Sequence, residues 1–301
     1  MNPYEVCTLC PRACRVNRQT GGKGRCGMTA EIRLARAARH HWEEPCISGT
    51  AGSGAVFFAG CPLGCVYCQN RAISSGEAGA IIPPARLTEI FWELKEQGAH
   101  NINLVTATHF APTVAACIRA ARAEGFDLPF VWNTSGYETS ETLALLSGLI
   151  DIYLTDLRYM RAETARLYSG AADYPAVAKE ALRHMVADTG PCAFDDAGIL
   201  RRGTVVRILL LPGRLAEAKL ALVHLNKHYR GKVWVSLMQQ YTPMPGMPAP
   251  LDRRVTPEEY ASLVRFAEEL GLTDAYTQER EAATESFIPP FDETGVRKEH
   301  S

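Results

Sequence analysis

Three cysteines in one short stretch carry the strongest chemical signal in this chain. Cys61, Cys65 and Cys68 stand in the run Cys-Pro-Leu-Gly-Cys-Val-Tyr-Cys, a C-x3-C-x2-C spacing that offers three thiolates from a single loop. Cysteine thiolates are the usual ligands of iron–sulfur clusters. A cubane cluster contains four irons, so three ligands leave one iron open, and an open metal position is typical of catalytic rather than structural sites.

The residues on either side of these cysteines favour a cluster-binding loop. The apolar run 55–59 predicts a strand directly before the loop, and Gly60 and Gly64 permit tight backbone turns. Gln69 and Asn70 follow as polar groups that can hydrogen-bond near sulfur. A zinc site completed by a distant histidine is the alternative that the spacing leaves open.

Length and composition indicate an ordinary globular protein. The chain has 301 residues and is 47% apolar, enough for one large α/β domain with an appendage or for two small domains. Its formal net charge of -1 gives no electrostatic case for binding nucleic acid or a membrane surface. No apolar run approaches the roughly 20 residues of a membrane span.

The cellular compartment follows from the beginning of the chain and from its cysteines. Residues 1–6 lack the basic and apolar regions of a signal peptide, so we expect a cytoplasmic protein. In a reducing compartment the ten cysteines are interpreted as metal or redox ligands rather than as a disulfide framework.

Beyond the cysteine loop, short apolar runs alternate with longer amphipathic ones. The short runs predict strands at 55–59, 102–106, 129–133, 150–155, 204–210 and 233–237. The longer runs predict helices near 84–98, 111–124, 139–148, 174–188, 214–229 and 256–270. Six strand–helix repeats in this order favour a parallel sheet with right-handed crossovers. The pattern leaves open whether the sheet is doubly wound or an incomplete barrel.

Polar residues stand where the first predicted strands end, the edge at which parallel sheets gather their chemistry. Thr106, Thr108 and His109 come at the end of the second predicted strand and offer hydrogen-bond acceptors. Asn133 and Ser135 follow the third as short polar groups. For these two the alternative is a helix N-cap, a position at which Asn and Ser are also favoured.

The later strands end in charged and amide side chains. Asp156 follows the strand 150–155, and Gln240 follows the strand 233–237. Arg207 lies inside an apolar strand, where an unpaired charge would be costly to bury. We therefore expect Arg207 to face a polar interior and to pair with Asp156 or with an acidic ligand.

A second group of cysteines opens the chain. Cys7, Cys10, Cys14 and Cys26 form a C-x2-C-x3-C-x11-C pattern surrounded by glycines, which predicts a second metal site. Zinc and an iron–sulfur cluster both accept four cysteine ligands, so spacing does not decide between them. A structural zinc is favoured because nothing nearby looks substrate-binding. Free thiols without a metal are the alternative.

The C-x3-C-x2-C spacing, with the aromatic Tyr67 immediately before the third cysteine, resembles the radical S-adenosylmethionine (SAM) superfamily. The resemblance implies a [4Fe-4S] cluster on the three cysteines and SAM chelated to the open iron. One electron then cleaves SAM to methionine and a 5′-deoxyadenosyl radical, which abstracts hydrogen from a substrate. The resemblance also implies a partial (β/α)6 barrel, with the cluster loop after its first strand.

The resemblance extends to the strand ends. The run 133–136 (Asn-Thr-Ser-Gly) is similar to the Asp-Thr-Asn-Gly that touches SAM in activating enzymes, and the run 156–158 (Asp-Leu-Arg) to their Asp-Leu-Lys. The Gly-Gly-Glu that binds the SAM amino group there is absent, because Thr-Ala-Thr-His occupies 106–109. The residues to which the resemblance gives SAM-binding roles are Tyr67, Thr106, Thr108, His109, Asn133, Ser135, Asp156, Arg207 and Gln240.

Four segments together resemble one group of the superfamily, the pyruvate formate-lyase activating enzyme-related (PflX-like) proteins. These segments are the N-terminal cysteine block, 61–70, 239–243 and 286–295. The resemblance implies an oxidoreductase that activates a glycyl-radical enzyme, with a flavodoxin or ferredoxin as electron donor. Two departures weaken this label: the cysteine block precedes the cluster motif, and Gly-Gly-Glu is missing.

Two alternatives therefore stand beside the activase hypothesis. In the first, the protein is a radical SAM enzyme whose substrate is a small molecule or another peptide. In the second, the protein is an iron–sulfur electron carrier without SAM chemistry. The chain divides, on this interpretation, into a cysteine-rich extension (1–50), a radical SAM core (51–275) and a C-terminal tail (276–301).

Overall fold

A curved, largely parallel sheet forms the centre of the protein in the computed structural model, which describes residues 2–278 and 289–298. The parallel strands are β2 (Ser53–Phe58), β4 (Ile102–Val105), β5 (Phe130–Thr134), β6 (Ile152–Asp156), β8 (Leu200–Leu209), β9 (Trp234–Met238) and β10 (Ala275–Thr277). They lie in the order β10-β9-β8-β6-β5-β4-β2, so each strand–helix repeat adds a strand to the same growing edge. Among the described strands the two ends of the sheet do not meet, and the barrel is open.

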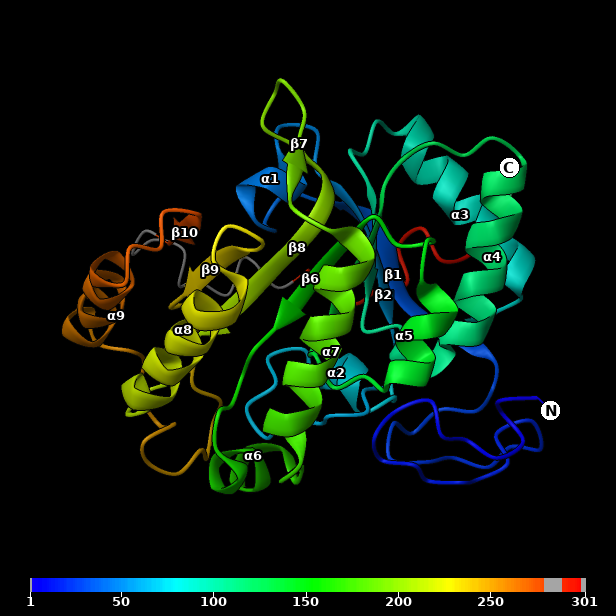
Figure 1. Ribbon diagram of the computed structural model, residues 1–301. Helices are drawn as coiled ribbons and strands as arrows, with labels where there is room; N and C mark the ends of the chain where they lie inside the picture. The colour runs from blue at the N-terminus through cyan, green and yellow to red at the C-terminus, as the bar shows by residue number, and fades with distance from the viewer. Residues whose placement is uncertain (1, 279–288, 299–301) are drawn as a thin grey trace.

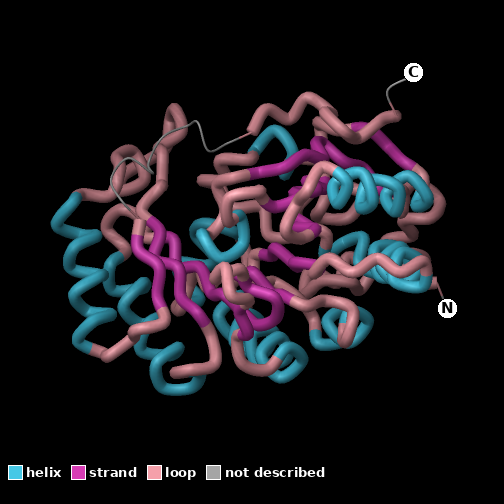
Figure 2. Tube along the Cα trace, turned by 90° about the horizontal axis from the view of Figure 1, so that it is seen from above, coloured by secondary structure: helices cyan, strands magenta, loops and turns pink. Residues whose placement is uncertain are grey.

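The helices follow the outer side of this sheet, as Figures 1 and 2 show. The principal ones are α3 (Pro84–Glu96), α4 (Ala111–Ala123), α5 (Ser140–Leu146), α7 (Tyr174–Thr189), α8 (Leu215–Tyr229) and α9 (Pro257–Glu269). All six predicted strands and all six predicted helices are present within a few residues of their expected ends. The open, mostly parallel sheet confirms the predicted partial (β/α)6 barrel.

Local capping explains why two of these helices begin where they do. The Thr139 side chain accepts a hydrogen bond from the Thr142 amide at 3.2 Å, at the start of α5. At the start of α9, Thr256 and Glu259 form a reciprocal capping box, with bonds of 3.2 and 2.9 Å. Such caps satisfy amide groups that the first turn of a helix leaves without partners.

The antiparallel edge of the sheet was not predicted. The strand β1 (Ile32–His40) pairs antiparallel with β2 and with β3 (Ala80–Ile82). The sheet thus takes in residues 32–40, which the sequence division placed in the N-terminal extension. Smaller elements were also missed. They are α1 (Pro45–Ser48), α2 (Arg71–Ser74), the 3-10 turn η1 (Thr108–Phe110), α6 (Ala162–Ser169), the edge strand β10 and β7 (Ala193–Phe194), which forms a hairpin with β8.

The C-terminal tail lies along β1. The amide of Ala37 donates to the Thr294 carbonyl at 2.9 Å, and Arg36 forms a 2.7 Å ion pair with Asp292. Residues 279–288 and 299–301, including the Ser-Phe-Ile of the PflX-like tail segment, lie outside the described residues. None of the described helices is both long and apolar enough to cross a membrane.

Apolar residues close one end of the barrel interior and leave the other end polar. Val131, Ile152, Leu154 and Val205 point to the concave side of the sheet and pack against Ile47 of α1. Since strand side chains alternate between faces, the residues two positions further along each strand share this concave side. Those positions are Asn133, Asp156 and Arg207, and they begin a polar layer above the apolar floor.

Candidate active site

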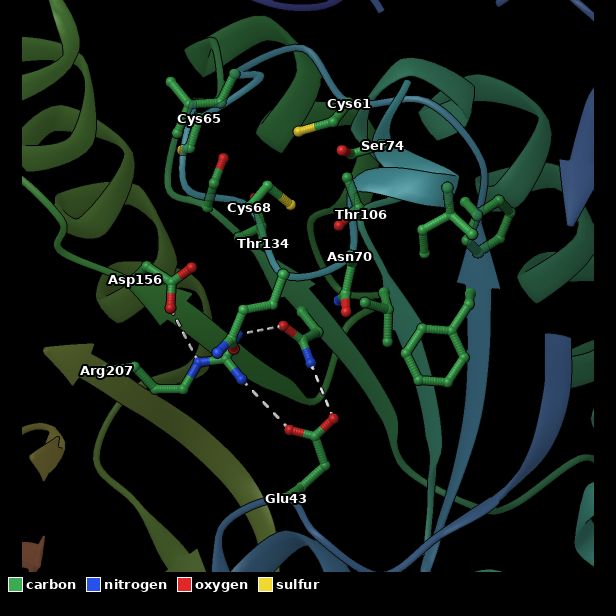
Figure 3. A pocket seen from close by; sticks show the side chains of 18 of the residues that line it. Glu43, Cys61, Cys65, Cys68, Asn70, Ser74, Thr106, Thr134, Asp156 and Arg207 are labelled. Carbon is green, nitrogen blue, oxygen red and sulfur yellow. Dashed lines mark hydrogen bonds and ion pairs between the residues drawn. The ribbon is translucent and has the colours of Figure 1, made fainter. Parts of the chain in front are cut away.

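The three motif cysteines lie together at the wall of one cavity, which opens at the C-terminal ends of the parallel strands. They belong to the loop that leaves β2, in which Gly60 and Gly64 have positive φ values of 83° and 64°. A side chain at position 60 would lie 2.6 Å from the Cys26 carbonyl oxygen, so glycine is required there. The loop path and the thiol positions agree with the prediction from spacing (Figure 3).

The cavity has distinct ends. Figure 3 shows the cysteines at one end and a cluster of charged side chains around Arg207 at the other. The predicted residues Thr106, Asn133, Ser135, Asp156, Arg207 and Gln240 all line this cavity. The structure therefore brings six of the nine predicted SAM-binding residues to the same space as the cysteines.

The environment of Cys61 and Cys68 favours the protonated form of these two thiols when no metal is bound. Burial, with help from the neighbouring thiols, raises the pKa of Cys61 to about 12, and burial also raises the pKa of Cys68. The Ser169 hydroxyl donates to Cys65 Sγ at 3.1 Å and lies 2.8 Å from the Tyr159 hydroxyl oxygen. A bound metal deprotonates such thiols by its own charge, so loading the site releases protons.

No three His, Cys, Asp or Glu side chains among the described residues are arranged around a single metal ion. A structural zinc requires four ligands about one ion, so the zinc alternative for the motif cysteines has no support. The cubane cluster has no such requirement, because each thiolate binds a different iron atom. Three thiols from one loop on a shared cavity wall fit that donor set.

The N-terminal cysteines gather in the same segment without forming such a centre. Cys7, Cys10 and Cys26 are buried, and burial raises the pKa of Cys10 to about 12. All are free thiols. The predicted second metal site, zinc above all, therefore lacks support in the described residues.

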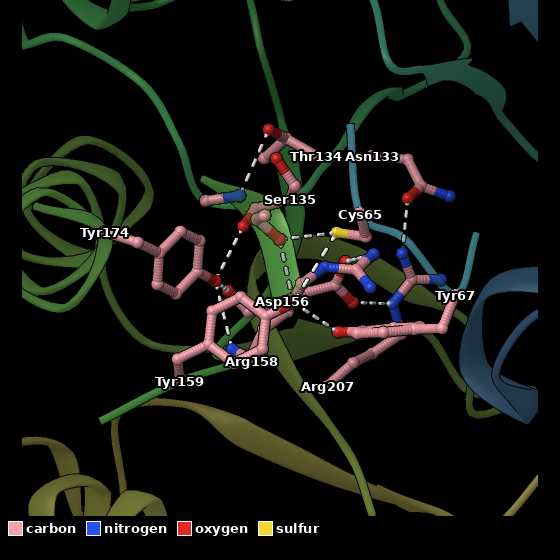
Figure 4. Close-up of polar contacts among 12 residues, drawn as sticks. Cys65, Tyr67, Asn133, Thr134, Ser135, Asp156, Arg158, Tyr159, Tyr174 and Arg207 are labelled. Carbon is pink, nitrogen blue, oxygen red and sulfur yellow. Dashed lines mark hydrogen bonds and ion pairs between the residues drawn. The ribbon is translucent and has the colours of Figure 1, made fainter. Parts of the chain in front are cut away.

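A cation stands beside the cluster-binding thiols. Arg158 lies with Cys65 and Asp156 in Figure 4, and one of its terminal nitrogens contacts Asp156 Oδ2 at 2.5 Å. Its Nε is buried and has no partner among the described residues. A buried donor without a partner is costly, and Arg158 also lines the cavity, so its guanidinium is a candidate to bind an anionic ligand group there. Sequence reasoning noted the Asp-Leu-Arg run but did not assign Arg158 a role.

Arg207 is held by three protein acceptors at the inner end of the cavity. Its Nε donates to Asp156 Oδ1 at 3.0 Å, its Nη2 to Asn133 Oδ1 at 2.6 Å, and its Nη1 pairs with Glu43 at 3.3 Å. The expected pairing with Asp156 is confirmed. Every nitrogen of this guanidinium already has a protein partner. Arg207 therefore holds the surrounding polar side chains together and is not the place where we expect an anionic ligand to bind.

Glu43 is the residue of this network that sequence reasoning missed. It comes from the segment between β1 and α1, and its carboxylate also accepts from Asn103 Nδ2 at 3.1 Å. Burial raises the pKa of Glu43, and the charge of Arg207 opposes that shift. Trp42 lines the cavity from the same segment, and His40 lines it from the end of β1. Sequence reasoning missed these residues because the preceding strand β1 was not recognised.

Three predicted residues lie outside the cavity lining. Tyr67 is buried against the rings of Tyr159, Tyr168 and Tyr241. Thr108 donates to the buried Glu138 at 2.7 Å, and His109 Nε2 lies 2.8 Å from the Ala59 carbonyl oxygen. These side chains support the loops from behind, and their positions give no support to direct contact with SAM.

The structure tests the helix N-cap alternative for Asn133 and Ser135. The N-cap of the following helix is Thr139, and both earlier residues line the cavity. The N-cap alternative is therefore wrong.

Thr106 has an unusual backbone. Its φ of +61° places a β-branched residue in the left-handed region, where such residues are rare and strained. Its amide donates to the Asn133 carbonyl at 2.8 Å, and the residue lines the cavity. Strain of this kind is concentrated at functional sites, and the surrounding structure must maintain it.

Comparison with known families agrees with this geometry. The radical SAM superfamily matches residues 55–218, more than half of the chain, and the protein belongs to that superfamily. Membership implies a [4Fe-4S] cluster and SAM as cofactors and an enzyme of the radical redox type.

Individual relatives are distant. An uncharacterized protein of Methanocaldococcus jannaschii is 26% identical over 284 residues, which cover 91% of this chain and 78% of that protein. A radical SAM methyltransferase from Sphaerobacter thermophilus has a TM-score of 0.53 at 15% identity, over 75% of this chain and 66% of that one. SuiB of Streptococcus suis, bound to the precursor peptide SuiA, has a TM-score of 0.52 at 10% identity, over 74% of this chain and 47% of SuiB. These structures share the fold.

The burial of His109 predicts a pH dependence of folding. Burial, with the nearby Arg18, lowers the pKa of His109 to about 3, while an unfolded histidine titrates near 6.5. Below about pH 6.5, His109 binds a proton in the unfolded chain but stays neutral in the folded protein. The free energy of unfolding therefore falls as pH falls from 6.5 toward 3. The slope is at most about 1.4 kcal/mol per pH unit.

Urea unfolding of the cluster-free protein at pH 7.5, 6.5 and 5.5 tests this expectation. The His109→Gln variant should lose that part of the pH dependence, and the exposed His41→Gln control should retain it. Equal pH slopes for wild type and His109→Gln would contradict the assignment.

Proposed function

We propose that this protein cleaves SAM reductively at a [4Fe-4S] cluster held by Cys61, Cys65 and Cys68, and uses the product radical to take hydrogen from a polypeptide substrate. The observation that carries the proposal is one cavity that joins the three thiols, the unpartnered Nε of Arg158 and the strained Thr106. When bound, the cluster and SAM supply a 5′-deoxyadenosyl radical.

The residues of this chain bind and orient the reactants. Ser169 donates to Cys65 Sγ, a contact that favours the charged thiolate. We assign the SAM carboxylate to the Arg158 guanidinium and the SAM ammonium to the Thr106 hydroxyl, which occupies the place of the missing Gly-Gly-Glu. Ser135 and Gln240 offer polar groups for the nucleoside.

One residue of the cavity wall bears on the substrate. Trp42, 58% exposed, lines the cavity and offers an apolar contact for an incoming polypeptide segment. We propose a backbone glycine of a glycyl-radical enzyme as the substrate, with a flavodoxin or ferredoxin as electron donor. A small molecule is the alternative.

Anaerobic reconstitution with iron and sulfide, followed by dithionite and SAM, tests the reaction. Wild-type protein should produce 5′-deoxyadenosine, and the Cys61→Ala/Cys65→Ala/Cys68→Ala variant should produce none above background. Cys192→Ala, which changes a thiol far from the loop, is the matched control and should keep full production. SAM cleavage by the triple variant would place the chemistry elsewhere, and reduction of wild type without cleavage would favour an electron carrier.

The substrate is tested by the fate of its hydrogen. With a candidate glycyl-radical enzyme deuterated at glycine, we expect deuterium in 5′-deoxyadenosine and a persistent glycyl signal in electron paramagnetic resonance. Deuterium transferred from a small molecule instead would contradict the activase proposal but not SAM cleavage.

Thr106 provides a separate test of cofactor binding. Thr106→Gly relieves the left-handed strain but adds chain entropy to the unfolded state, so the free energy of unfolding should change by less than about 1 kcal/mol. Loss of a hydrogen bond to a charged group should weaken SAM binding by about tenfold or more. Thr106→Ser keeps the hydroxyl and should bind nearly as tightly as wild type.

Equilibrium binding of SAM to the reconstituted protein, measured without oxygen, gives the readout. Wild-type affinity in Thr106→Gly would remove Thr106 from the proposed SAM contacts.

A further inference from the structure

Arg12 links the N-terminal cysteine block to the cluster-binding loop. Its Nε donates to the Pro62 carbonyl at 3.0 Å and its Nη2 to the Leu63 carbonyl at 3.0 Å. The same guanidinium donates to the carbonyls of Ser169 at 2.7 Å and Gly170 at 2.6 Å. One side chain therefore holds four backbone carbonyls from two segments that are more than a hundred residues apart in the sequence.

Both of these segments act directly on the cluster thiols. Pro62 and Leu63 stand between Cys61 and Cys65, so the position of their peptide groups sets the spacing of the first two ligands. Ser169 is the last residue of α6, and its hydroxyl contacts Cys65 Sγ at 3.1 Å. Arg12 thus fixes the loop that carries the thiols against the helix end that donates to one of them.

The chemistry of these contacts requires a guanidinium. Arginine presents five N–H donors in a planar fork, whereas a lysine ammonium is a compact point charge on a flexible stem. The carbonyls at the end of α6 carry partial negative charge, which favours a cation there. The guanidinium also lies over the Tyr137 ring, 5.3 Å from its centroid. No carboxylate of the described residues forms an ion pair with Arg12, so its bonding is directed at the two backbone segments.

The segment that carries Arg12 is anchored to the core by other residues. Thr142 Oγ1 donates to the Leu9 carbonyl at 2.8 Å. The buried Arg18 donates to the carbonyls of Met28, Thr29 and His109. The N-terminal segment can therefore keep its position when Arg12 is replaced. The cluster-binding loop then loses its hydrogen bonds to Arg12.

We propose that Arg12 is a positioning residue for the cluster, and that the N-terminal cysteine block supports the cluster-binding loop through this side chain. The inference rests on the proposed cluster at Cys61, Cys65 and Cys68. It gives the N-terminal block a role in the site that requires no second metal.

The test compares Arg12→Ala, Arg12→Lys and the control Arg15→Ala. Arg15 is exposed, lies three residues away and forms no side-chain hydrogen bond or ion pair among the described residues. In reconstituted protein without SAM we would measure the rate at which a chelator removes iron, together with the resonance spectrum of the reduced cluster. Loss of outer ligand support usually costs about 10–100-fold in metal affinity. We expect at least about tenfold faster release from Arg12→Ala, with an altered spectrum, and wild-type behaviour from Arg15→Ala.

Arg12→Lys keeps the charge but not the fork, so its release rate should lie between wild type and Arg12→Ala. This variant decides the question if Arg12→Ala does not fold. Wild-type release and spectrum in a folded Arg12→Ala, or in Arg12→Lys, would overturn the proposal.

A readout without metal separates this inference from the proposed function. In cluster-free protein, alkylation of Cys61 and Cys65 measured by mass spectrometry should be faster in Arg12→Ala than in wild type, with Arg15→Ala unchanged. If wild type assembles no cluster while this difference is present, the proposed function fails and the support of the loop by Arg12 stands. Equal alkylation rates would overturn the inference itself.

Discussion

The site depends on keeping three thiols close together, open to a cavity, and unbonded to one another. All ten cysteines of the chain are free, so the fold rather than a disulfide holds Cys61, Cys65 and Cys68 in place. The loop gets its path from β2 on one side and its support from α6 and the N-terminal segment on the other. Because burial raises the pKa of Cys61 and of Cys68, the arrangement favours a metal centre that supplies its own positive charge.

A second constraint is the burial of charge at the inner end of the cavity. Arg207 lies just above the apolar floor that α1 closes, and it is matched by Asp156, Asn133 and Glu43. Removing one partner of a buried ion pair costs about 3–5 kcal/mol, because the remaining charge stays uncompensated. This network therefore fixes the ends of β5, β6 and β8 relative to one another. The same strand ends carry Ser135 and lead to Arg158, the residues we assign to SAM.

The sequence predicted the parts of this protein that repeat or that lie close together along the chain. The strand–helix alternation gave the sheet, and the cysteine spacing gave the loop. The strand β1 was not predicted, because Arg33, Arg36 and Arg39 interrupt its apolar pattern. In addition, β1 pairs with other strands and is not followed by a helix of a strand–helix repeat. Glu43 was not predicted either, because its partner Arg207 is 164 residues away in the sequence. His109 was assigned to the cofactor because polar strand-end residues often face a site, but here the 3-10 turn η1 directs it to the Ala59 carbonyl.

The most direct measurement of the central claim is the electron paramagnetic resonance spectrum of the reduced, reconstituted protein before and after SAM is added. Three cysteine ligands with an open iron predict that SAM changes the g-values of the cluster, because it becomes a ligand of that iron. A spectrum unchanged at saturating SAM would mean that the iron is closed or absent, and the account of this site would be wrong.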